Sequence, residues 1–126
     1  QFVLNNNELT CAGSDNAPQS IIRNVADFQV RYLFQDRAAA ITGLPTIQYM
    51  NAAAVGANWM SVFGVEVCLV LYGDERIDLP AGSTYTGCDG VAVNMSNTGT
   101  LPAIRKNRLH MVFRSVFQLR SQGLAG

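Results

Sequence analysis

Residues 108–120 read Arg108-Leu-His-Met-Val-Phe-Arg-Ser-Val-Phe-Gln-Leu-Arg120 and alternate between two kinds of side chain. One side of an extended backbone carries mostly apolar residues: Leu109, Met111, Phe113, Ser115, Phe117 and Leu119. The other side carries Arg108, His110, Val112, Arg114, Val116, Gln118 and Arg120. A period of two is typical of a strand with one buried face. We therefore predict a long strand whose apolar side faces the core and whose basic side faces solvent.

The composition limits the class of protein. With 126 residues, a single domain over residues 1–126 is expected, and it is large enough to bury a core. Only 14% of the residues are charged, against about 25% in ordinary globular domains, and the formal net charge is zero. This balance fits an exported protein, or one packed against neighbours, better than a cytosolic binder of polyanions. No apolar run reaches the roughly 18 residues of a membrane span, so any anchor is expected outside these residues.

Further strands are expected upstream of residue 108, and they predict a mainly β fold. A hairpin is predicted over 2–11, because asparagine tolerates the positive φ that a turn at Asn5-Asn-Asn7 requires. Strands are also expected over 25–34, 46–49 and 62–72. The strand over 62–72 is apolar on both faces, which predicts a central position with cover on both sides.

The remaining segments are expected to hold little regular structure. Asn51 is a plausible N-cap for a helix of a turn or two that Gly56 weakens. Loops are predicted over 13–20 and 73–104. A loop as long as the second is uncommon in a compact domain unless it has a function or is held in place by a cross-link. Smaller elements are expected as a helical turn over 37–41, an edge strand at 91–93 and a frayed tail at 122–126.

These elements sum to an antiparallel sheet of about four strands with short helical turns. A lone sheet must cover its apolar face, and the sequence shows no amphipathic helix of three or more turns that could do so. Two alternatives follow: the sheet folds on itself, or the covering helix lies outside these residues.

Side chains that often carry chemistry form no recognisable constellation. His110 is the only histidine and has no carboxylate near it in sequence, so we expect a solvated surface residue. The acids Asp74, Glu75, Asp78 and Asp89 follow no regular metal-binding spacing and are expected to be solvated. The sequence therefore predicts no catalytic residues, no metal site and no cofactor.

The three cysteines, Cys11, Cys68 and Cys88, form no CxxC pair, and one histidine does not complete a convincing zinc site. Two interpretations stay open from the residues alone. One is a single disulfide with a leftover thiol, and the other is three buried thiols.

A basic stripe is predicted from Arg108, Arg114 and Arg120, which recur at six-residue intervals on one strand face. Such a stripe could follow a phosphate backbone. The alternatives are pairing with Asp27 and Glu66 on neighbouring strands, or protection of a sheet edge against aggregation. No aromatic side chains alternate with the arginines, as single-strand binders usually require.

Eight segments share their order with one known family: Leu9–Cys11, Gln19–Tyr32, Ile47–Tyr49, Ala54–Val55, Asn58–Trp59, Val62–Leu71, Tyr85–Gly90 and Arg108–Arg120. In this order they resemble PilW-type minor pilins of type IV pili. A weaker similarity extends to the J-type minor pseudopilins of type II secretion, through the strand patterns at 25–32 and 65–71.

The resemblance implies a pilin-like α+β fold in which these residues form the C-terminal part of the globular head. The long apolar N-terminal helix of the family would lie outside them, anchoring the protein in the inner membrane with a periplasmic head before it enters the pilus fibre. The implied function is non-enzymatic: to prime pilus assembly with other minor pilins and the major pilin, near the pilus tip. Alternatives are a DNA- or surface-binding pilus module that uses Arg108, Arg114 and Arg120, or a type II secretion pseudopilin.

The same resemblance implies a disulfide between Cys68 and Cys88, which would pin the loop over 73–104. Cys11 would then pair with a residue upstream of this sequence, or stay free.

Overall fold

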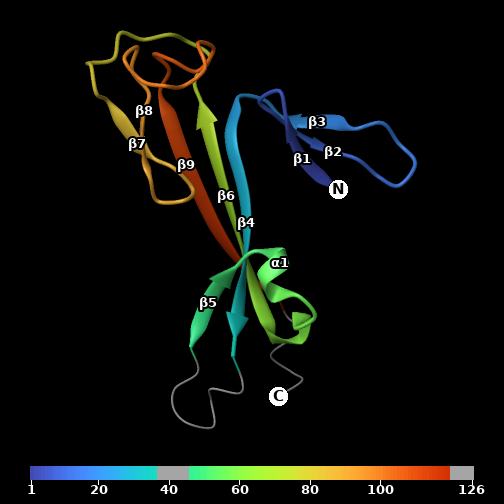
Figure 1. Ribbon diagram of the computed structural model, residues 1–126. Coiled ribbons are helices and arrows are strands. Elements are labelled where there is room, and N and C mark those ends of the chain that lie inside the picture. Colours follow the sequence, from blue (N-terminus) through green and yellow to red (C-terminus); the bar gives the residue numbers. More distant parts are fainter. Residues whose placement is uncertain (37–45, 120–126) are drawn as a thin grey trace. The chain divides into compact units, whose positions relative to one another are not determined.

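The computed structural model of the protein describes residues 1–36 and 46–119 (Figure 1). These residues are 48% strand and 6% helix, and the sheets are antiparallel, which confirms the predicted mainly β fold. The expected turn over 37–41, Arg120 and the tail at 122–126 lie outside the described residues. Within the two described ranges, no helix has the length and apolar character needed to cross a membrane.

The main sheet has four strands in the order β5 (Ile47–Met50), β4 (Val25–Gln35), β6 (Val62–Tyr72) and β9 (His110–Gln118). The predicted central position of the strand over 62–72 is confirmed, because β6 lies between β4 and β9. The closing strand is shorter than predicted, since regular pairing begins at His110 rather than at Arg108. The predicted sheet of about four strands corresponds to this sheet, and the described residues contain two further, smaller sheets.

A second sheet contains β1 (Phe2–Asn5), β2 (Glu8–Cys11) and β3 (Gln19–Ile22). The predicted hairpin is confirmed: Asn5 lies opposite Glu8, and the two turn residues, Asn6 and Asn7, have φ values of 48° and 61°. Two consecutive positive φ angles are typical of a type I′ turn, which matches the twist of the flanking strands. The predicted loop over 13–20 is wrong at its end, because β3 already begins at Gln19 and pairs with β2.

The long segment after β6 is ordered by its own pairing. It contains a third sheet, formed by β7 (Thr84–Thr86) and β8 (Ala92–Asn94), where only a strand at 91–93 was expected. Backbone hydrogen bonds extend this order, since the Met95 N–H donates to the Ser83 carbonyl (2.9 Å) and the Asn107 N–H donates to the Met95 carbonyl (2.8 Å). The segment is therefore a packed part of the fold.

The chain forms two compact units. The first contains Gln1–Gln29 and Cys68–Phe113, and the second contains Val30–Val67 and Arg114–Gly126. Buried apolar side chains of the first unit are Leu9, Val25, Cys68, Val70, Tyr72, Cys88 and Met95, and those of the second are Leu33, Val55 and Val62.

The second unit holds the helical turns. The Asn51 side chain accepts a hydrogen bond of 2.8 Å from the Ala54 N–H, which confirms Asn51 as the N-cap of α1 (Ala52–Val55). Gly56 ends this single turn with a φ of 59°, a left-handed angle that glycine adopts without a steric penalty. A 3₁₀ turn, η2 (Trp59–Ser61), follows, and Trp59 contacts Tyr32 edge to face at a centroid distance of 4.9 Å.

Candidate functional site

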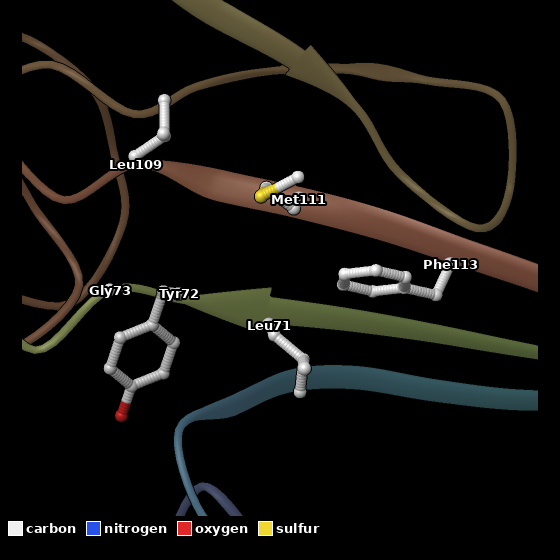
Figure 2. A pocket seen from close by; sticks show the side chains of 6 residues that line it. All are labelled: Leu71, Tyr72, Gly73, Leu109, Met111 and Phe113. Atoms are coloured by element: carbon white, nitrogen blue, oxygen red, sulfur yellow. The ribbon is translucent and has the colours of Figure 1, made fainter.

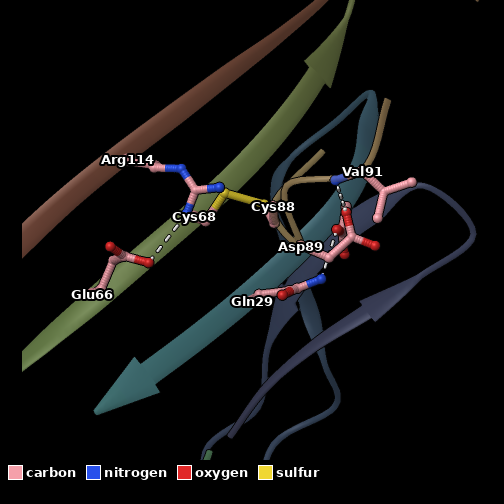
Figure 3. The surroundings of a disulfide bond; sticks show 8 residues. Gln29, Glu66, Cys68, Cys88, Asp89, Val91 and Arg114 are labelled. Atoms are coloured by element: carbon pink, nitrogen blue, oxygen red, sulfur yellow. Dashed lines mark hydrogen bonds and ion pairs between the residues drawn. A yellow bond between two sulfur atoms is a disulfide. The ribbon is translucent and has the colours of Figure 1, made fainter. Parts of the chain in front are cut away.

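In the first unit, one side of the sheet is covered by the segment that follows β6. Cys68 and Val70 form a buried cluster with Cys88, and Ala26, Tyr85 and Val112 pack against it. A disulfide joins Cys68 to Cys88 with a Cα–Cα distance of 5.9 Å (Figure 3). This is the pairing that the resemblance implies. Cys11 is a half-buried free thiol.

His110 lies on this covered side, and its predicted position at the surface is wrong. Its side chain is only 5% exposed, and its ring stacks on that of Tyr85 with centroids 4.6 Å apart and planes 5° from parallel. The Tyr72 ring is a second neighbour at 5.6 Å. The physical reason is long-range: the disulfide holds Tyr85 over the side of the sheet that His110 faces.

The opposite side of the same sheet is apolar and open. Leu109, Met111 and Phe113 are 48%, 55% and 48% exposed. Together with Leu71, Tyr72 and Gly73 they line a shallow pocket of about 230 Å³ (Figure 2). We call Leu71, Leu109, Met111 and Phe113 the apolar face. The prediction that this side of the strand faces the core is wrong for these residues, because the covering segment packs on the other side.

The side of the sheet that is covered follows from the contacts of Cys68. On β6, Cys68, Val70 and Tyr72 share one side, so a disulfide from Cys68 brings the downstream segment to that side. Val112 packs against the same cluster, which places the even-numbered residues of β9 on the covered side. The odd-numbered residues, Leu109, Met111 and Phe113, then point the opposite way.

Arg108 and Arg114, the two arginines of the basic stripe that the structure describes, each have partners within their own unit. In the first unit, Arg108 donates from Nη1 to the carbonyl oxygens of Gly73 (2.9 Å) and Asp74. In the second unit, Arg114 forms a 3.2 Å ion pair with Glu66, one of the two partners considered above (Figure 3). Arg120 lies outside the described residues, so a continuous basic face stays a prediction.

The acids of the segment after β6 serve local hydrogen bonds. Asp89 Oδ1 accepts from the Val91 N–H at 3.0 Å, and Asp74 Oδ1 accepts from the Asn24 side chain. Among residues 1–36 and 46–119, no group of three or more histidine, cysteine or acidic side chains is placed to hold a metal ion. In the first unit, one side of the sheet is therefore covered by the disulfide-linked segment after β6, and the other side is apolar and open.

Comparison with known proteins identifies the family. The family model described as Type IV Pilus-assembly protein W matches residues 2–121, nearly the whole chain. The chain belongs to the PilW family. This confirms the resemblance found in the sequence. No curated protein and no solved structure matches the chain.

Membership of the PilW family supports a role in type IV pilus assembly and an association with the cell envelope or the pilus. It also suggests interaction with other components of pilus assembly. PilW proteins are assembly proteins and are not a known enzyme family.

Proposed function

We propose that this PilW chain is a non-enzymatic minor pilin that helps to prime type IV pilus assembly within a minor-pilin complex near the pilus tip. Its partners would be other minor pilins and the major pilin. Its head would lie in the periplasm, anchored to the inner membrane by an apolar N-terminal helix of the kind that the resemblance implies, before it enters the fibre.

The observation that carries this proposal is the open apolar face of the first unit. Three side chains on one side of the sheet are about half exposed, although fully burying each would contribute about 1.5–3 kcal/mol. An apolar face of this kind marks a surface that another element covers. The pilin helix is the element that we propose for it, and the covered complex is the form that assembles.

The disulfide supports an exported location. Cys68 and Cys88 are buried in the core cluster, and such bonds form and persist in oxidising compartments such as the bacterial periplasm. The Cys68–Cys88 disulfide keeps the segment after β6 on one side of the sheet. The other side thus stays free for a helix.

The proposal is tested by charging the apolar face in cells that make the full-length protein. We expect Met111→Asp to abolish or strongly reduce surface pili, because a carboxylate on this face is costly to bury against an apolar helix. Electron microscopy of surface pili and co-purification of the other pilins provide the measurements.

The matched control is Ile104→Asp. Ile104 belongs to the same unit, is 51% exposed and does not line the pocket of the apolar face. Normal piliation in Ile104→Asp, with reduced piliation in Met111→Asp at equal protein level, supports the proposal. Normal piliation in both variants would contradict it.

A second candidate, a DNA- or surface-binding pilus module, is motivated by Arg108, Arg114 and Arg120. A third, a pseudopilin of type II secretion, is motivated by the strand patterns alone. Assaying both pilus formation and type II secretion in a strain that lacks the gene separates the last candidate from the first.

A further inference from the structure

The His110 stack, which we define as His110, Tyr85 and Tyr72, joins the segment after β6 to the main sheet. Tyr85 lies on β7 and Tyr72 ends β6, so the His110 ring contacts both the covering segment and the sheet. The disulfide, three residues beyond Tyr85, is a covalent link between this segment and β6. The segment therefore has one permanent attachment here and one that depends on ring packing.

The hydrogen bond of His110 defines its tautomer. Nδ1 lies 2.9 Å from the Arg108 carbonyl oxygen, which can only accept, so the neutral ring carries its proton on Nδ1. Nε2 is buried and has no hydrogen-bond partner among the described residues. Protonation would therefore create a buried N–H and a positive charge at an atom that no acceptor faces, which opposes burial of the ring.

The charged groups around the stack also oppose an imidazolium. Burial lowers the pKa of His110, and the positive charge of Arg105 lowers it further, although the bond to the Arg108 carbonyl acts in the other direction. Arg105 itself is held by a hydrogen bond of 3.2 Å to the Ala26 carbonyl.

On the far side of the stack, burial raises the pKa of Tyr85. Arg105 opposes this increase, while Asp27 on β4 and Asp89 after β7 add to it. The charged groups that face the stack are therefore Arg105, Asp27 and Asp89, together with Arg108, whose guanidinium carbon lies 6.0 Å from the centre of the Tyr72 ring.

We propose that the His110 stack is an acid-sensitive latch, in which protonation of His110 releases the β7–β8 hairpin from the sheet while the Cys68–Cys88 disulfide keeps it tethered. Release exposes the ring to water, which can solvate the new N–H and its charge. The disulfide limits the change to a local opening, because Cys88 stays attached to β6.

The direction of the pH dependence follows from linkage. In the open state His110 has an ordinary pKa of about 6.5, and in the closed state its pKa is lower. The closed state is therefore favoured in full above about pH 6.5. Its population relative to the open state falls by up to about tenfold for each pH unit below that, until the pKa of the closed state is reached.

Amide hydrogen exchange on the disulfide-intact protein tests the latch between pH 7 and pH 5. The probe is Asn107, three residues before His110, whose N–H donates to the Met95 carbonyl at the end of the hairpin (2.8 Å). We expect its protection factor, corrected for intrinsic exchange, to fall by up to about tenfold per pH unit. The N–H groups of Gly87 and Met95 are bonded within the hairpin, to the Val91 and Ser83 carbonyls, and should stay protected as internal controls. Fluorescence of Trp59, the only tryptophan and a member of the second unit, should stay constant.

The decisive variant is His110→Phe, which keeps an aromatic ring in the stack and removes the titrating group. Its protection factors should not change over the same range. Unchanged protection in the wild type, or an equal decrease in His110→Phe, would overturn the proposal, the second result assigning the effect to other groups such as Asp27 and Asp89.

A second measurement needs no variant. His110 is the only histidine, so its ring resonances can be titrated directly in the wild-type protein. A midpoint below about 6.5, with protection that falls between pH 6.5 and that midpoint, supports the latch. A midpoint at or above 6.5 overturns it.

Discussion

At the scale of single residues, two cysteines determine what covers the sheet. Cys68 points to the same side of β6 as Val70 and Tyr72, and Cys88 is buried against it. The bond therefore carries the downstream segment to that side, buries His110 and leaves Met111 on the open side.

Removal of this disulfide should lower stability substantially. Cys68 and Cys88 lie 20 residues apart, and in the chain-entropy model a cross-link of that length contributes about 3 kcal/mol. We expect Cys68→Ala/Cys88→Ala to lower the free energy of unfolding by about this amount, measured by urea denaturation.

Cys11→Ala is the control, since Cys11 is a free thiol and its replacement leaves the cross-link intact. It should unfold at nearly the wild-type urea concentration. A double variant as stable as the wild type would show that the disulfide does not stabilise the fold by restricting the unfolded chain.

At the scale of elements, the local patterns predicted strands and turns well. Alternation predicted β4, β6 and most of β9, and the asparagines predicted the turn between β1 and β2. These elements were predictable because their signals lie within a few neighbouring residues. β7 was missed, since its three residues lie in a segment rich in turn-forming residues and are ordered by contacts with β8.

The turn after β8 depends on a close approach of backbone to backbone. Gly99 donates a hydrogen bond of 3.1 Å to the Ser96 carbonyl, and a Cβ on Gly99 would collide with the backbone carbonyl of Asn94. Gly99→Ala should therefore destabilise the protein by about 1–3 kcal/mol, because the backbone must shift to accept the methyl group. Urea denaturation gives the value.

Gly13→Ala is the matched control for this substitution. The nearest atom to a Cβ on Gly13 is Nδ2 of Asn16 at 3.7 Å, an ordinary van der Waals distance. It should leave the urea midpoint nearly unchanged. Equal urea midpoints for the two variants would show that the backbone near Asn94 can shift with little loss of stability.

At the scale of the whole molecule, the question is which surface carries the function. Arg108 and Arg114 have partners within their own units, which favours assembly through the apolar face over binding through the basic stripe. We expect Arg108→Gln/Arg114→Gln/Arg120→Gln to leave duplex DNA binding, measured over a salt series, unchanged from the wild type.

The DNA-binding candidate predicts a different result. The triple variant would then bind more weakly, and the slope of log affinity against log salt would become less steep by up to about three, one for each lost phosphate contact. Such a change would make nucleic-acid binding through the basic stripe the leading proposal for the protein.

The sequence by itself determined the mainly β class, the paths of the long strands, the Asn6–Asn7 turn, the Asn51 cap and membership of the PilW family. These follow from short-range periodicity, from local backbone preferences and from the order of segments along the chain. Only the tertiary structure decided which side of β9 is covered. Alternation defines two faces but does not say which of them meets a partner, and the contacts that decide it join Cys68 to Cys88 and Tyr85 to His110 across many residues of chain.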